Sequence, residues 1–189
     1  MKHLSLALLV VIASLTSTHT SFAQMTGLPK GMPICRDQSK KVLPFGNAEV
    51  VKLKTTTPNL YKQQVFVKAQ FVSMGSVSQN SYGKHLRFIV SLADKGKTVA
   101  HENLIEISQS MNGYIAPTAA DLTGTIYICG EYSTTDMNKL PKITDFEPSA
   151  TGAMIHWTHA AGPDVNVPTG RHPHGWLYAN GKLFGVYAR

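Results

Sequence analysis

The sequence predicts a mainly β fold, and three observations lead to this prediction. Residues 64–77 and 85–93 alternate apolar and polar side chains, which is typical of strands with one buried face. Asn180 and Gly181 lie between two apolar runs, which is a strong signal for a β-hairpin. No segment of useful length has a clean apolar period of about 3.6 residues, so no amphipathic helix competes with the strands.

The first 23 residues have the features of a secretory signal peptide. Lys2 gives a short basic start, residues 4–15 form an apolar run, and cleavage is expected after Ala23. The run is shorter than the roughly 20 apolar residues that a membrane-spanning helix needs. We therefore expect a periplasmic or secreted protein whose mature chain has 189 minus 23, or 166, residues. That length suits one domain.

Residues 24–58 are expected to form an extended N-terminal arm. The segment contains several prolines and the basic pair Lys40-Lys41, and one short strand is possible over residues 49–54. Cys35 and Cys129 are the only cysteines, and they are expected to pair in an oxidising compartment. Closing a loop of about 95 residues would stabilise the fold by roughly 4 kcal/mol and would tie the arm to the domain.

The domain, residues 59–189, begins with a predicted three-strand meander. In the first strand Val65, Val67, Ala69 and Phe71 share one face, and Gly75 is a candidate bulge. The second strand covers residues 85–93, and a turn at residues 94–97 leads to a third strand within residues 98–104.

The rest of the domain adds further strands. Residues 108–123 have weak helical character and are followed by a strand at residues 124–133, in which Ile126 and Ile128 face opposite to Tyr127 and Cys129. Residues 153–159 and the hairpin at 175–187 complete the pattern. Five or more curved strands with one short helical connection fit a small Greek-key barrel of the OB type, and a β-sandwich is the alternative.

Several enzyme signatures are absent from the chain. It contains no G-x-S-x-G elbow, Walker loop, G-x-G-x-x-G turn, H-E-x-x-H helix or EF-hand loop, which argues against the common enzyme classes that carry them.

Residues 152–176 hold four of the eight histidines and both tryptophans. One hypothesis is a metal-dependent hydrolase in which Zn²⁺ or another transition metal is bound by His156, His159 and His172, with His174 or Asp164 as further ligands. Residues three apart on a strand face opposite sides, so His156 and His159 converge only if the chain turns between them. In the structural alternative, one of these histidines hydrogen-bonds a loop carbonyl and the tryptophans pack.

The favoured hypothesis is an exported ligand-binding barrel. A formal net charge of +7 favours an anionic or polar ligand, such as an oligonucleotide, an oligosaccharide or a phosphorylated headgroup. Stacking and charge would come from a surface containing Lys84, Arg87, Tyr132, His156, Trp157, His159, Arg171, His172, His174 and Trp176, with Tyr127, Tyr178 and Lys182 nearby. A secreted protein-interaction module is a further alternative, although no feature of the sequence specifically favours it.

Short motifs along the chain resemble a bacterial domain-of-unknown-function family of small, often exported proteins. The most specific are H-W-T-H at residues 156–159 and H-P-x-G-W at residues 172–176, and others are K-H-x-R-F-I-V at residues 84–90, G-E-Y at residues 130–132 and N-G-K at residues 180–182. The resemblance spans residues 65–184 and implies a compact OB-like barrel without an established activity. The chain departs from it in the longer connection between the two histidine motifs.

Overall fold

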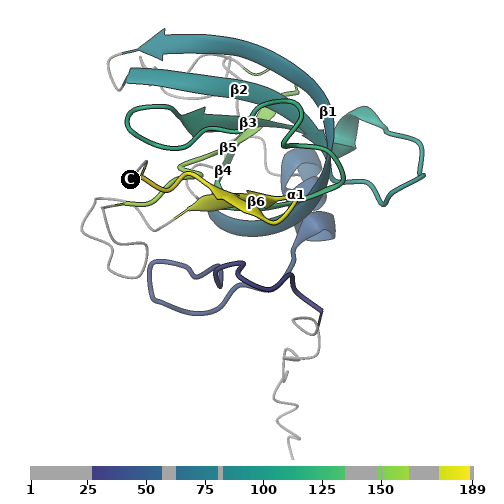
Figure 1. The fold of residues 1–189 in the computed structure, drawn as a ribbon. Helices are drawn as coiled ribbons and strands as arrows, with labels where there is room; N and C mark the ends of the chain where they lie inside the picture. Colours follow the sequence, from purple (N-terminus) through teal and green to yellow (C-terminus); the bar gives the residue numbers. More distant parts are fainter. Residues whose placement is uncertain are drawn as a thin grey trace, which may run out of the picture.

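A computed structural model describes residues 27–56, 63–80, 83–134, 149, 151–161 and 175–187 of the chain (Figure 1). The fold is mainly β, as predicted. Its strands are β1 (Gln63–Asn80), β2 (Gly83–Ser91), β3 (Leu104–Ser110), β4 (Thr125–Thr134), β5 (Ala153–His156), β6 (Trp176–Ala179) and β7 (Lys182–Phe184). The helices are α1 (Asn47–Thr56) and a short 3₁₀ turn, η2 (His101–Asn103).

All seven strands belong to one sheet, and five of them form a ring. The sheet order is β1-β2-β3-β5-β4-β6-β7, and β1 also pairs with β4. The ring therefore runs through β1, β2, β3, β5 and β4 and back to β1. Every pairing is antiparallel except β3 with β5, which is parallel. On its other edge β4 pairs first with β6 and then with β5, so the β6–β7 hairpin extends from the ring.

One long strand closes the ring. The first half of β1 pairs with β4 up to Gln70, and from Gln70 onward it pairs with β2. The register with β2 shifts twice, and the second shift, between Met74 and Val77, contains Gly75. A Cβ at Gly75 would lie 2.7 Å from the carbonyl oxygen of Arg87, so only glycine allows this approach. The predicted irregularity at Gly75 is confirmed, and it lies in the part of β1 that pairs with β2, after the change of partner at Gln70. The strand is strongly curved (Figure 1).

Two predictions for the middle of the chain are wrong. The third strand does not lie within residues 98–104, because η2 occupies residues 101–103 and β3 begins at Leu104. Residues 108–123 are not helical, since they contain the end of β3 followed by turns. The inward face of β3 ends on the buried Gln109, and its outward face carries polar residues, so its apolar alternation is short.

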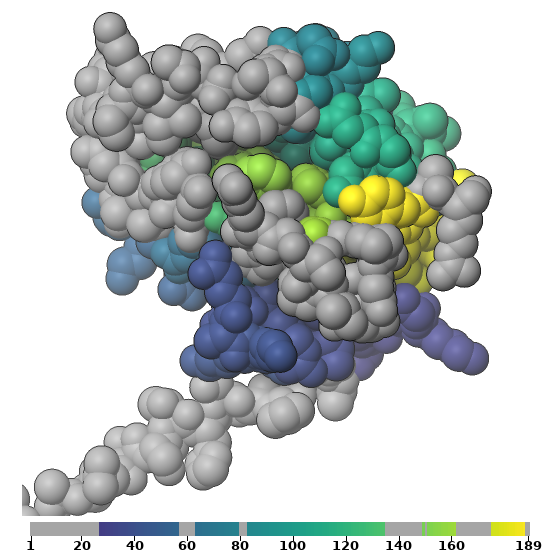
Figure 2. Space-filling view, turned by 90° about the vertical axis from the view of Figure 1, so that its left-hand side faces the viewer, coloured from purple at the N-terminus to yellow at the C-terminus, as the bar shows by residue number. Residues whose placement is uncertain are grey.

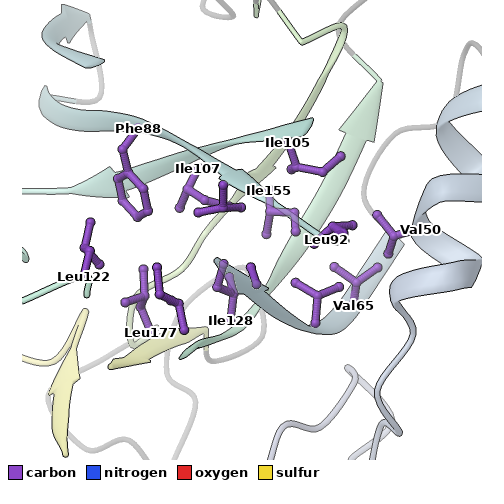
Figure 3. Packing of buried hydrophobic residues seen from close by; sticks show 14 of the residues in the cluster. Val50, Val65, Phe88, Leu92, Ile105, Ile107, Leu122, Ile128, Ile155 and Leu177 are labelled. Atoms are coloured by element: carbon purple, nitrogen blue, oxygen red, sulfur yellow. The ribbon is translucent and has the colours of Figure 1, made fainter. Parts of the chain in front are cut away.

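The interior of the ring is an apolar core. Inward-facing side chains from all five ring strands pack with Leu177 of β6 (Figure 3). Val50 of α1 lies near Val65 and Leu92 at one end of this core, and Leu122 lies at the other end (Figure 3). The alternation of β4 is confirmed, because Ile126 and Ile128 are in this cluster while Tyr127 and Cys129 face outward.

The N-terminal arm is only partly extended, because residues 47–56 form helix α1 rather than the predicted strand. Hydrogen bonds join both ends of this helix to residues far away in the sequence. The Asn47 amide donates to the carbonyls of Lys68 and Leu92, and its oxygen accepts from the Lys68 amide. Near the other end, Lys54 Nζ donates to the carbonyls of His101 and Leu104. Burial lowers the pKa of Lys54, and Glu102 partly offsets this effect. No helix in the described part of the chain is both long and apolar enough to span a bilayer.

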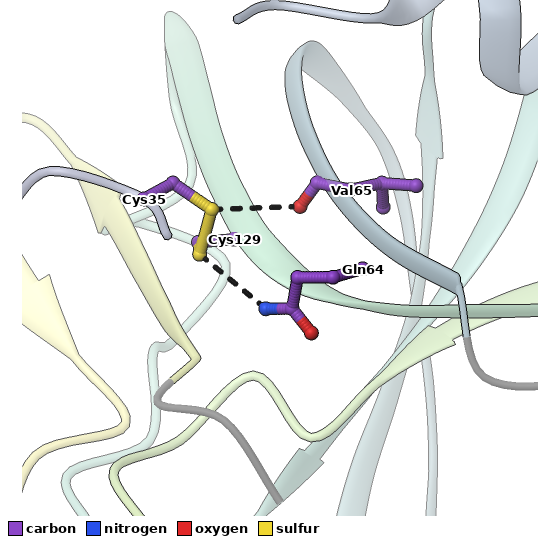
Figure 4. Close-up of a disulfide and its surroundings, with 4 residues drawn as sticks. All are labelled: Cys35, Gln64, Val65 and Cys129. Carbon is purple, nitrogen blue, oxygen red and sulfur yellow. Dashed lines mark hydrogen bonds between the residues drawn. A yellow bond between two sulfur atoms is a disulfide. The ribbon is translucent and has the colours of Figure 1, made fainter. Parts of the chain in front are cut away.

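A disulfide joins Cys35 to Cys129, as the sequence predicted (Figure 4). Both cysteines are fully buried in a second apolar cluster, on the outer face of the sheet, with Phe66, Trp176 and Tyr178. The Gln64 side-chain amide donates to Cys129 Sγ (Figure 4). Cys35 Sγ lies 3.7 Å from the Val65 carbonyl oxygen, and this is a contact only, because a disulfide sulfur has no hydrogen to donate. In the space-filling view the arm lies against the C-terminal strands (Figure 2).

The predicted C-terminal hairpin is confirmed. Asn180 and Gly181 have φ angles of 49° and 77°, which a tight primed turn requires. The Asn180 amide donates to the Asp121 carbonyl and to Thr123 Oγ1, and Lys182 Nζ lies 2.7 Å from Asp121 Oδ1. The hydrogen bonds from Lys182 and Thr118 hold the pKa of Asp121 below its usual range.

Candidate polar site on the outer face of β4 and β5

A row of polar side chains crosses the outer face of three adjacent strands. Gln64 of β1 is the register partner of Glu131 on β4, and Glu131 is the partner of His156 on β5. The neighbours of these residues in sequence, Val65, Tyr132 and Ile155, face the core, so strand alternation directs the polar residues outward. Directly opposed residues on one face lie close enough to interact. We name these three residues together with Ser133 the outer polar row.

Three residues of the outer polar row are buried although the row lies on the outside of the ring, and Gln64 is half-buried. Glu131, Ser133 and His156 have 2, 0 and 7% of their surface exposed. Ser133 Oγ lies 3.3 Å from His156 Nε2, so the hydroxyl and the ring share a hydrogen bond. Burying polar groups is costly unless they are hydrogen-bonded.

The chain turns sharply directly after His156. Trp157 has a φ of 52°, in the left-handed region that bulky side chains rarely adopt. Backbone hydrogen bonds fix this corner, because the Gly175 amide donates to the His159 carbonyl and the Ala160 amide donates to the Gly185 carbonyl. We name residues 156–159 the H-W-T-H corner.

Three glycines make room for the H-W-T-H corner. A Cβ at Gly130 would lie 2.7 Å from the His156 carbonyl oxygen, and Cβ atoms at Gly175 and Gly185 would collide with the carbonyl oxygens of Trp157 and Thr158. Gly175 belongs to the H-P-x-G-W motif. The two motifs that characterise the sequence therefore meet in space, at least through this glycine.

His159 is held in one tautomer at its Nδ1 atom. This atom lies 3.1 Å from the Ala160 carbonyl oxygen, and because a carbonyl only accepts, Nδ1 carries a proton. The Tyr114 hydroxyl donates to the same carbonyl at 3.0 Å. The predicted structural role, a histidine bonded to a loop carbonyl, is thus present at His159.

Aromatic rings connect the H-W-T-H corner to the surface. The ring centroids of His156 and His159 lie 5.6 and 5.5 Å from that of Trp157. The Tyr114 ring is 4.4 Å from His159 and 4.6 Å from Tyr187. Trp157 and Tyr114 are half-buried and Tyr187 is exposed, so the series leads outward.

Two predicted stacking residues are not at the surface. Tyr132 is fully buried in the main core, where burial raises the pKa of its hydroxyl and the Thr134 hydroxyl opposes this shift. Trp176 is 4% exposed and packs edge-on against Phe66 beside the disulfide. Stacking of a ligand on either ring is therefore not supported, because apolar neighbours cover both.

The predicted cationic residues differ in exposure and in ion pairing. Lys84 is exposed at the start of β2. Arg87 is paired with Glu106 of β3, and both side chains are largely buried, so its charge is already balanced. Arg171, His172, His174 and Asp164 lie outside the described residues. Within the described ranges no group of three His, Cys, Asp or Glu side chains is arranged to hold a metal ion.

Sequence reasoning missed Glu131 and Ser133. Both follow Cys129 on the same face of β4, at alternate positions, and Glu131 stands in the G-E-Y motif. The alternation alone would have placed them beside Cys129. The sequence does not show which residues of β5 pair with them, because this pairing joins segments separated by a long connection.

Comparison with known protein families, with curated proteins and with solved structures finds no match for this chain. The geometry of the outer polar row and the H-W-T-H corner is therefore the basis for the function proposed below.

Proposed function

We propose that this chain is an exported β-barrel protein of the OB type that binds an anionic or polar ligand beside the H-W-T-H corner. The ring of five strands supports the OB-type assignment. A fully buried disulfide supports export to an oxidising compartment.

The observation that carries this proposal is the left-handed backbone of Trp157. Such a conformation costs about 1–3 kcal/mol and is typically retained at functional sites. Here the half-buried indole has the rings of His156 and His159 as neighbours, and His156 is hydrogen-bonded to Ser133. A half-buried indole face suits stacking against a sugar, a base or the apolar part of a phosphate-bearing headgroup.

The test uses Trp157→Gly, because glycine adopts a positive φ without strain. We expect this variant to unfold at nearly the same urea concentration as the wild type, since relief of strain offsets the lost ring contacts. We also expect it to lose binding. The probes are a short single-stranded DNA, a sulfated oligosaccharide and inorganic phosphate, measured by titration calorimetry at low and high salt.

Lys95→Ala, in the exposed turn after β2, is the matched control and should bind as the wild type does. Wild-type protein that binds none of the three probes, or a Trp157→Gly variant of unchanged affinity, would contradict the proposal.

A metal-dependent hydrolase is the second candidate, and the tautomer of His159 favours it. Histidines that ligate metals usually donate the other ring N–H to a carbonyl or carboxylate, as His159 Nδ1 does to Ala160. His156, His159 and His172 would then hold the ion, which would activate a water molecule. Elemental analysis should find one transition-metal ion per chain, lost in His159→Ala and kept in His101→Ala. Chelator-free protein without stoichiometric metal would refute this candidate.

A further inference from the structure

The described residues contain two pairs of neighbouring tyrosines. Tyr114 and Tyr187 have ring centroids 4.6 Å apart at an interplanar angle of 38°. Tyr127 and Tyr178 are 6.4 Å apart, edge to face at 63°. The rings of the first pair are therefore closer together and more nearly parallel than those of the second.

The backbone holds Tyr114 and Tyr187 side by side. They form an antiparallel bridge, and next to it the Ile115 amide donates to the Val186 carbonyl and the Gly185 amide donates to the Ile115 carbonyl. Directly opposed residues in such a bridge project to the same side. The pair is therefore a fixed arrangement, although the two residues are 73 positions apart in the chain.

The two hydroxyl oxygens lie 3.1 Å apart. Tyr114 has one proton to donate and the Ala160 carbonyl accepts it, so the Tyr187 hydroxyl donates to Tyr114. Burial raises the pKa of Tyr114. Because the carbon ortho to each hydroxyl is bonded to the carbon that bears it, adjacent hydroxyls bring the ortho carbons of the two rings close together.

We propose that Tyr114 and Tyr187 form an oxidative cross-linking site, at which a one-electron oxidant that consumes peroxide joins the rings as dityrosine. Each phenol loses one electron and one proton, and the two phenoxyl radicals combine through their ortho carbons. Each ortho carbon then loses its hydrogen as a proton and each oxygen takes up a proton, so both rings return to the phenol form with no further net loss. Overall the pair loses two hydrogen atoms and one hydrogen peroxide is reduced to two water molecules.

Access and supply of oxidising equivalents both favour this pair. Tyr187 is 37% exposed, so an oxidant reaches its ring directly. A radical formed at Trp157 also has a short path to it, through the rings of His159 and Tyr114, with centroids 5.5 and 4.4 Å apart at each step. The other pair differs in geometry, since Tyr178 is 5% exposed and its hydroxyl donates to the Lys30 carbonyl.

The experiment treats the full-length oxidised protein with peroxidase and hydrogen peroxide. We expect dityrosine fluorescence to appear, and mass spectrometry of a digest should find one peptide pair, containing Tyr114 and Tyr187, lighter by two hydrogen atoms. The product should remain a monomer on a denaturing gel.

Tyr187→Phe keeps the ring and removes the hydroxyl, and we expect it to lose most of the fluorescence while keeping the wild-type melting temperature. Tyr127→Phe is the matched control and should react as the wild type does. Three outcomes would overturn the proposal: no dityrosine in the wild type, equal yield in Tyr187→Phe, or a cross-link that joins different tyrosines or different chains.

Discussion

At the scale of single residues, close backbone contacts define the candidate site more than its histidines do. The sequence drew attention to the H-W-T-H and H-P-x-G-W motifs, and the structure shows that Gly175 of the second motif packs on the Trp157 backbone of the first. The need for glycine at this contact could not be deduced from one sequence, because nothing in the chain indicates which carbonyl oxygen a glycine faces. The histidines were visible, but their partners Ser133 and Glu131 were not recognised.

The close contact at Gly175 gives a stability prediction. A methyl group there would collide with the Trp157 carbonyl, and we expect Gly175→Ala to lower the free energy of unfolding by about 3 kcal/mol or more. Gly152→Ala is the comparison, because Gly152 has a φ of 72° but open space around its Cβ position. Its cost should be only about 1–2 kcal/mol, from backbone strain. Urea unfolding measures both, and equal losses would contradict the steric explanation.

His85 gives a prediction for pH. Burial lowers the pKa of its half-buried ring, the hydrogen bond to the Gly83 carbonyl opposes this, and Arg87 adds to the lowering. Between the lowered native pKa and the ordinary value of about 6.5, the unfolded state therefore binds more of this proton than the native state does. Stability from this group rises with pH through that window.

We expect NMR titration to give His85 a pKa below about 6.5, and His85→Gln to weaken the dependence of stability on pH between about 5 and 7. A measured pKa above the ordinary value would contradict the assignment.

At the scale of elements, the sequence predicted those strands whose faces differ in polarity. β1, β2, β4 and the terminal hairpin have clear apolar alternation or a turn signal, and all four are present. Helix α1 was missed because only Val50 on it is buried, so it has no apolar stripe. β3 was misplaced because its buried positions include Glu106 and Gln109, which mimic a solvent-facing segment. Both elements depend on partners far away in the chain.

Asn47 tests that explanation for α1. Its side chain makes three hydrogen bonds to the backbones of Lys68 and Leu92 at the start of the helix. We expect Asn47→Ala to destabilise the protein by roughly 2–3 kcal/mol, from about 1 kcal/mol per bond. Amide hydrogen exchange over residues 47–56 should accelerate. Lys52→Ala, on the exposed side of the helix, should change neither quantity, and an unaffected Asn47→Ala would show that the helix is stable on its own.

At the scale of the whole molecule, ring closure was the property that the sequence determined least. Alternation identifies strands but not their neighbours, so a barrel and a sandwich remained open. In the structure β1 pairs with both β2 and β4 and changes partner at Gln70, so that five strands of one sheet form a ring. The disulfide was predictable, because only two cysteines exist and the start of the chain resembles an export signal.

Removal of the disulfide gives a prediction at this scale. We expect the Cys35→Ala, Cys129→Ala double variant to lose about 2–5 kcal/mol of stability, chiefly because the unfolded chain regains the freedom of a loop closed across 94 positions. Urea unfolding of the variant should coincide with that of the reduced wild type. A loss below about 0.5 kcal/mol, the usual range of a surface substitution, would show that the cross-link adds nothing to the packing of the arm.

The position of the disulfide also divides the molecule into two parts that need not open together. The covalent loop from Cys35 to Cys129 contains α1, β1, β2, β3 and half of β4, whereas β5, β6, β7 and the H-W-T-H corner follow it. The C-terminal part can therefore leave the sheet while the loop stays closed, as a sub-global opening with faster amide exchange in β5 to β7 than in β1 to β3. A dityrosine link would end this independence, because Tyr114 lies within the loop and Tyr187 beyond it.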